Sequence, residues 1–254
     1  THDGPIFFGG DAGGFASFLG QIDEIRTYTN ALTAEQVLTA GSWSFGENSG
    51  SQALDASIHT NHARLTTATA WVEGKSGSGI DLGKGQVVIP NAYQTMLPPS
   101  GGPFSISFWV KPRELPVGSV GLMTCGTPNV NGWQLTVDVE ASGTTSLRFV
   151  STNYGGTLDL RAPVSWSTGV WSKVDLTHNG GIATVYVDGL KIKADYGAIQ
   201  GSRAPLVIGT APGALNFNGV FDELRVLRRE LDPSDIGPVA FPVWETAIKN
   251  TSTN

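Results

Sequence analysis

Four polar and aromatic side chains interrupt alternating apolar runs, and their chemistry suits sugar recognition. Strand 104–110 alternates apolar with small polar residues, and Trp109 falls on the face opposite to the phenylalanines. Tyr186, Arg148 and Asp138 likewise sit between apolar neighbours. Rings that stack and groups that hydrogen-bond are typical of small-ligand sites. We therefore expect these four residues to line a ligand-binding face, while packing of Trp109 beneath a loop is the alternative.

Paired carboxylates, the catalytic groups of glycosidases, have one weak candidate. Asp138 and Glu140 lie two residues apart on one strand face. Glu140, however, borders the turn at Ala141–Gly143, where a carboxylate is usually solvated. No Ser-His-Asp order, Cys-His pair or phosphate-binding loop occurs. The sequence thus assigns no catalytic residue, and a glycosidase or polysaccharide lyase is only an alternative function.

Composition excludes several other classes of function. The formal net charge of −6 disfavours nucleic acid, because binding to phosphates needs a basic face. No apolar run approaches the roughly 20 residues of a membrane span. The single cysteine, Cys125, permits no intrachain disulfide and lies in an apolar stretch, so it is expected to be a small buried hydrophobe.

Many short alternating strands must position these candidates. Residues 133–139, 146–150, 171–177 and 183–187 alternate with period two, and Asn179-Gly180-Gly181 predicts a hairpin between the last two. Only residues 33–38 and 232–236 carry short helical signals, with Thr33 and Asp232 as caps. Trp133 and Trp171 begin alternating strands and are expected in the core. This pattern predicts an all-β protein built from antiparallel sheets.

The chain also contains a long repeat. Gly20-Gln-Ile-Asp-Glu-Ile-Arg26 resembles Gly219-Val-Phe-Asp-Glu-Leu-Arg225, at an offset of 222 − 23 = 199 residues. So long an offset suits tandem domains rather than a solenoid. We expect residues 1–41 to be the end of a preceding repeat, 42–237 a complete domain, and 238–254 a linker or extension. The N-terminal segment is expected to pair with this domain or with a neighbouring chain.

Four motifs in order resemble the laminin-G-like, concanavalin A-like family of secreted bacterial proteins. They are the opening strand near Trp43, the strand Phe104–Pro112, the hairpin from Trp171 to Gly189, and the ending Phe217–Arg225. The resemblance implies a two-sheet antiparallel jelly-roll sandwich. It also implies a secreted or cell-surface module that binds a polysaccharide or other glycan on the concave sheet or rim loops. The alternative is a structural or adhesion repeat that contacts neighbouring domains by strand addition.

The family often binds calcium, which the resemblance places between the opening loop and the last strand. Asp222 matches the aspartate of the closing motif, and Asp55 and Glu47 lie in the opening segment. Ca²⁺ takes about 6–8 oxygen ligands, so these three are the expected metal ligands. The alternative is that Asp222 caps local backbone groups or pairs with Arg225. His59 and His62 share the loop but lack a third ligand for a transition metal.

Overall fold

The computed structural model describes residues 6–10, 13, 17–21, 27–90, 102–128, 130–153, 156–197, 199, 202 and 204–236. The chain divides into two compact units, Thr1–Thr33 and Ala34–Asn254. In the first unit, the described residues include one isolated bridge, Gly10↔Ser17. The second unit begins at Ala34 and so includes α1, while the boundary between repeats at residue 42 stays a prediction. Asp23, Glu24 and Arg26 of the first repeat and the predicted extension 238–254 lie outside the described residues.

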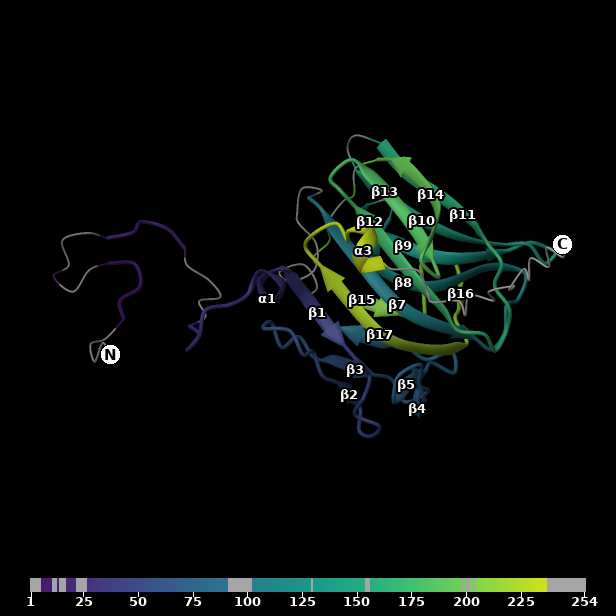
Figure 1. Cartoon of the computed structure of the whole chain (residues 1–254), viewed down its shortest axis with the longest axis horizontal. Helices are drawn as coiled ribbons and strands as arrows, with labels where there is room; N and C mark the ends of the chain where they lie inside the picture. Colours follow the sequence, from purple (N-terminus) through teal and green to yellow (C-terminus); the bar gives the residue numbers. More distant parts are fainter. Residues whose placement is uncertain are drawn as a thin grey trace, which may run out of the picture. The chain divides into compact units, whose positions relative to one another are not determined.

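The second unit contains a first sheet in the order β14-β13-β12-β7-β17-β5-β4, with β1 also paired to β17. Its strand pairs are antiparallel. These strands are β1 (Thr39–Trp43), β4 (Ala70–Glu73), β5 (Ser78–Asp81), β7 (Phe104–Pro112), β12 (Ser172–His178), β13 (Ile182–Val187), β14 (Leu190–Tyr196) and β17 (Gly219–Leu227). The predicted hairpin at Asn179-Gly180-Gly181 therefore joins β12 to β13 (Figure 1).

A second sheet has the order β11-β10-β9-β8-β15-β6-β3-β2, with β16 parallel to β8. Its strands are β2 (Gln52–Ala53), β3 (Ala63–Leu65), β6 (Val87–Ile89), β8 (Gly118–Thr127), β9 (Asn131–Val139), β10 (Thr145–Asn153), β11 (Gly156–Val164), β15 (Leu206–Ile208) and β16 (Leu215–Asn216). The strands from distant parts of the sequence interleave in both sheets, which gives the predicted jelly-roll topology.

The core fills the space between the apolar faces of the two sheets. The alternating residues of β7 and β10 point inward, so that Phe108 and Phe149 are fully buried. Phe108 stacks on Phe221 of β17 with ring centroids 5.2 Å apart. Trp133 of β9 is 1% exposed, as predicted for a core residue. The prediction of an all-β, two-sheet antiparallel sandwich is confirmed.

Two short helices occupy the positions predicted from their caps. Helix α1 spans Ala34–Leu38 and runs directly into β1, while α3 spans Pro233–Ile236 after β17. The Lys173 ammonium of β12 donates a hydrogen bond to the carbonyl oxygen of Ile236 at 3.5 Å, which places α3 over the outer face of the first sheet (Figure 1). Among the described residues, no helix is long and apolar enough to span a membrane.

Candidate functional site

Two tryptophans lie side by side on the outer face of the first sheet. Trp109 of β7 points away from the core because its neighbour Val110 is fully buried. Trp171 immediately precedes β12, and the pairing of Ser172 with Val110 puts it opposite Lys111 on the same outer face. The two residues thus occupy diagonal positions on adjacent strands, where backbone positions lie roughly 7–8 Å apart. We call Trp109 and Trp171 the tryptophan strip.

The ammonium group of a lysine lies over one face of each ring of the strip. The Lys75 ammonium nitrogen lies 4.5 Å from the ring centroid of Trp109, and that of Lys111 lies 4.8 Å from the Trp171 ring. Each such cation–π contact contributes about 0.5–1 kcal/mol at a partly exposed site. Both rings are half-buried, so each keeps part of its surface accessible. The strip therefore offers two partly exposed aromatic surfaces and two ammonium donors.

The placement of Trp171 corrects the expectation that it belongs to the core. In its strand Val174 and Leu176 are fully buried, and Trp171 is out of phase with both. It shares its phase with Lys173, and this parity was available in the sequence. Lys75 and Lys111 gave no signal of their own, because their role depends on which rings they cover.

Asp222 positions the turn that carries Lys75. The turn joins β4 to β5, and the Asp222 Oδ2 atom accepts backbone hydrogen bonds from Lys75 at 2.7 Å and Ser76 at 2.9 Å. Its Oδ1 atom accepts one from the backbone N–H of Glu223 at 2.8 Å. The carboxyl group is fully buried, and this burial raises its pKa, opposed by the three backbone donors. Asp222 thus accepts backbone N–H groups, as in the alternative to a metal ligand, but only that of Glu223 is local, and the other two belong to a turn distant in the chain.

The other residues of the closing motif also have structural roles. The register of β17 against β7 shifts between Asp222 and Arg225, and Glu223 there has φ of 50°. This left-handed residue marks a β-bulge directly after Asp222, which pairs with Trp109 of β7 on the outer face of the sheet. Arg225 pairs with Glu35 of α1, with Nη2 and Oε1 2.6 Å apart. In residues 222–225 the Asp-Glu-x-Arg sequence therefore forms a bulge and places the polar contacts of Asp222 and Arg225.

Asp55 stabilises the opening loop by accepting four hydrogen bonds through its two carboxylate oxygens. Its Oδ1 accepts the backbone N–H groups of Ser42 and Ser57, at 2.9 and 2.8 Å. Its Oδ2 accepts the Ser57 hydroxyl and the Asn61 N–H, both at 2.8 Å. A carboxylate has about four lone-pair sites, so these four donors leave none for a cation. His62 accepts the N–H of Asp55 through Nδ1 and so belongs to the same loop structure.

The three predicted calcium ligands do not fit one shared site. Glu47 accepts the N–H of Leu54 through Oε1, whereas Asp55 and Asp222 serve other backbone segments. Within the described residues, Glu47 Oε2 is buried without a hydrogen bond, and this single atom is the one oxygen of Glu47 left for a cation. The same part of the chain contains no group of three or more His, Cys, Asp or Glu residues able to hold a metal. Calcium needs about 6–8 oxygens, so these residues do not supply its shell.

Tyr186 shares the outer face of the first sheet with the strip but is covered. It pairs with Asp175 of β12 and packs against Leu227, Leu231 and Ile236. Burial, followed by the charges of nearby Glu230 and Asp175, raises the pKa of its phenol. Its ring therefore contacts the segment that ends in α3 rather than offering an open stacking surface.

Arg148 and Asp138 lie on the other sheet, so the four predicted ligand-binding residues do not form one site. Arg148 of β10 makes two hydrogen bonds of 2.7 Å to Asp159, which keep the pKa of that carboxyl below its usual range. Asp138 of β9 accepts hydrogen bonds from Ser119 and from Arg161. Both side chains alternate with buried residues and face outward from the second sheet. The outer faces of a sandwich point in opposite directions, which separates this pair from Trp109 and Tyr186.

The weak carboxylate pair and the cysteine have ordinary surroundings. Glu140 is exposed and accepts a hydrogen bond from Ser142 in the turn that follows β9. Asp138 is engaged by Ser119 and Arg161, as described above. Cys125 is buried, and burial raises the pKa of its thiol to about 12. It is therefore a small core residue, as the sequence predicted.

Comparison with known families explains this combination of sheets and motifs. The laminin-G-like model of the concanavalin A-like lectin/glucanases superfamily matches residues 81–237, which is more than half of the chain. The chain belongs to this superfamily. The laminin-G-like resemblance of the four motifs is thereby confirmed. No curated protein sequence matches the chain.

Solved structures of the same fold include carbohydrate-bound and toxin domains. Domain 4 of AbnA, a GH43 extracellular arabinanase from Geobacillus stearothermophilus, was solved in complex with arabinotriose. It is 22% identical, with a TM-score of 0.63, and the match covers 78% of this chain and 96% of that one. The binding domain of Paraclostridial Mosquitocidal Protein 1 is 17% identical with a TM-score of 0.64, over 79% of this chain. The botulinum neurotoxin serotype G binding domain is 13% identical with a TM-score of 0.61, over 78% of this chain. This laminin-G-like chain spans about half the length of the two toxin domains.

Proposed function

We propose that this laminin-G-like domain is a non-catalytic carbohydrate-binding module of a secreted multidomain protein, and that the tryptophan strip is its binding surface. The observation that carries the proposal is the diagonal placement of Trp109 and Trp171 on one outer sheet face, each ring held by a lysine. The arabinotriose complex of AbnA domain 4 supports the ligand class.

The chemistry of the strip matches the amphipathic surface of a sugar chain. Sugar rings have apolar C–H faces that stack on indole, and hydroxyl or carboxylate groups that accept hydrogen bonds from the ammonium groups of Lys75 and Lys111. A half-buried ring has less side-chain freedom to lose on binding than a fully exposed one, which favours affinity. Truncation of an aromatic side chain at the centre of a binding surface typically costs about 2 kcal/mol or more of binding energy, which lowers the affinity at least tenfold.

The test is affinity electrophoresis of the 254-residue chain on gels containing arabinan or other neutral and acidic polysaccharides. Trp109→Ala and Trp171→Ala should each lower the apparent affinity, calculated from the retardation, at least tenfold. The matched control is Tyr196→Ala, because Tyr196 is an aromatic residue 79% exposed on β14 of the same sheet. Unchanged binding by both tryptophan variants, with loss in Arg148→Ala, would move the site to the second sheet.

A structural or adhesion repeat is the second candidate function. It is favoured by α1, which the repeat assigns to the preceding domain and which is nevertheless fixed to this one through Glu35. In this case the tandem domains space and orient one another, and no polysaccharide retards the chain. A glycan array separates the two functions, because only the carbohydrate-binding function predicts binding to a specific glycan that Trp171→Ala abolishes.

A further inference from the structure

The helices α1 and α3 are counterparts in the two repeats. The offset of 199 residues places the start of α1 on the start of α3, since 233 − 34 = 199. It also aligns Val37 with Ile236, since 236 − 37 = 199. By sequence, α1 is therefore the closing helix of the preceding repeat.

In this domain the closing segment packs on its own sheet. The hydroxyl of Ser105 in β7 donates to the carbonyl of Arg229 at 2.8 Å and accepts the N–H of Leu231 at 2.9 Å. Leu231 and Ile236 are buried, the latter 4% exposed, in a cluster with Leu227 that also contacts Tyr186. Apolar contact with the outer face of the first sheet thus holds α3 in place.

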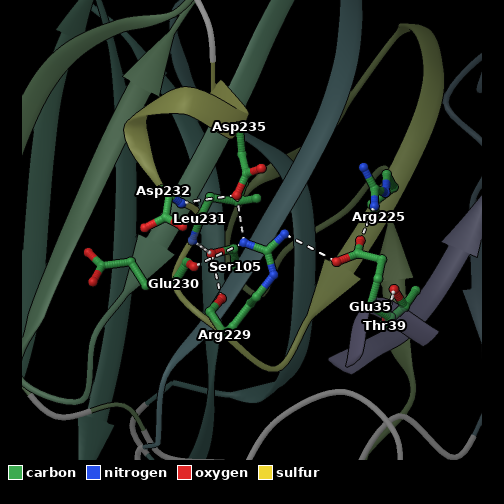
Figure 2. A network of polar contacts seen from close by, with 9 residues as sticks. All are labelled: Glu35, Thr39, Ser105, Arg225, Arg229, Glu230, Leu231, Asp232 and Asp235. Atoms are coloured by element: carbon green, nitrogen blue, oxygen red, sulfur yellow. Dashed lines mark hydrogen bonds and ion pairs between the residues drawn. The ribbon is translucent and has the colours of Figure 1, made fainter. Parts of the chain in front are cut away.

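Helix α1 contacts this domain in another way. It has no buried residue, and Val37, the counterpart of Ile236, is 48% exposed. Its Glu35 side chain forms two ion pairs, with Oε1 2.6 Å from Arg225 Nη2 and Oε2 3.2 Å from Arg229 Nη2. Figure 2 shows Arg229 between Glu35 and Asp235 of α3, so that one guanidinium group links both helices. A polar cavity of about 190 Å³ is lined by these same charged groups.

The junction between α1 and this domain contains no spare residues. Helix α1 ends at Leu38 and β1 begins at Thr39. The carbonyl of Leu38 accepts the N–H of Arg228 at 2.7 Å, and the Thr39 hydroxyl donates to the carbonyl of Glu35 at 2.8 Å. The C-terminal end of α1 is thereby fixed, while the apolar side chain of Val37 remains exposed.

We propose that α1 is shared between two domains: Val37 docks on the outer sheet face of a preceding laminin-G-like domain, and Glu35 fixes the same helix to Arg225 and Arg229 of this one. The occupant is a domain related to this one because the sequence before α1 repeats this domain's own closing motif. It would cover Val37 as Tyr186 and Leu227 cover Ile236 here. Ser234 occupies the position of Glu35 in α3, so α3 lacks the carboxylate for the same contact with a following domain.

Thermal unfolding of two chains tests the docking of Val37. One is the 254-residue chain, and the other is the natural chain extended to include the whole preceding domain. Val37→Asn should leave the melting temperature of the shorter chain unchanged and lower that of the preceding domain by several degrees in the longer one. Ile236→Asn is the matched control and should lower the melting temperature of the shorter chain. An unchanged longer chain, or a concentration-dependent dimer of the shorter chain that Val37→Asn abolishes, would overturn the proposal.

Hydrogen exchange tests the Glu35 contact independently of any glycan. Glu35→Gln should speed amide exchange in α1 at least severalfold in both chains, with the global melting temperature unchanged. In the longer chain it should also broaden the distribution of interdomain distances in small-angle scattering. Unaltered exchange in α1 would show that the two arginines do not hold the helix.

Discussion

Removal of the buried Asp222 carboxyl group should destabilise the domain by about 2–4 kcal/mol. Asp222→Ala leaves the backbone N–H groups of Lys75, Ser76 and Glu223 without their acceptor. Hydrogen bonds to a charged group contribute about 1.5–3 kcal/mol each, so three would give more than the stated loss. Two effects reduce the sum. Lys75 and Ser76 are exposed, so water replaces the carboxylate there, and the variant no longer buries a desolvated charge.

Guanidinium chloride denaturation followed by tryptophan fluorescence measures this loss. The matched control is Asp138→Ala, because Asp138 also accepts three hydrogen bonds from side chains, but its side chain is 20% exposed on the second sheet. Its removal should cost about 1 kcal/mol or less, as is usual for partly exposed pairs. If Asp222→Ala costs no more than Asp138→Ala, then solvent satisfies the turn and Asp222 does not position it.

Three further outcomes follow from the same contacts. Chelation with EDTA should leave the thermal unfolding curve unchanged because Asp222 and Asp55 serve backbone donors, and a melting temperature restored by added Ca²⁺ would contradict this. Burial raises the pKa of Asp175 above its unfolded value, so protonation of this carboxyl group favours folding. The wild type should therefore lose stability relative to Asp175→Asn as pH rises through the folded pKa. The loss should be at most about 1.4 kcal/mol per pH unit. A pH-independent difference in urea denaturation would refute this. Gly74→Ala should destabilise by about 1–3 kcal/mol because its new Cβ would lie 2.6 Å from Asp222 Oδ2 and the Ser78 backbone, whereas Gly46→Ala, with only Ser44 Oγ at 3.4 Å, should show little change.

The alternation of residues predicted which side chains leave the core but not which sheet they leave. Trp109 and Arg148 both face outward, as their phase indicated, because period two is a local property of a strand. Their strands belong to different sheets, and sheet membership is decided by pairings between distant segments, such as β7 with β17. The interpretation of four residues as one site therefore failed at the level of topology.

The sequence located the closing motif but gave two alternatives for its chemistry. Asp222 was expected either to bind calcium or to cap backbone groups, and its phase along the strand could not separate them. The donors that satisfy it lie 146 and 147 residues away in the chain. A family resemblance predicts the position of such a carboxylate more reliably than it predicts what the carboxylate binds. A cation and the backbone N–H groups of a turn both favour a carboxylate at that position.

The closing motif extends this argument to related domains. Asp23, Glu24 and Arg26 repeat Asp222, Glu223 and Arg225 in sequence, and we predict that any laminin-G-like domain that ends in this motif uses the bulge to hold a turn between two of its strands. In this domain that turn carries Lys75 to the face of Trp109. The motif fixes the backbone of the turn, whereas a binding strip also requires an aromatic residue at the position of Trp109 and another at that of Trp171. Repeats that keep the motif but lack these two rings should therefore fold in the same way and not bind the ligand.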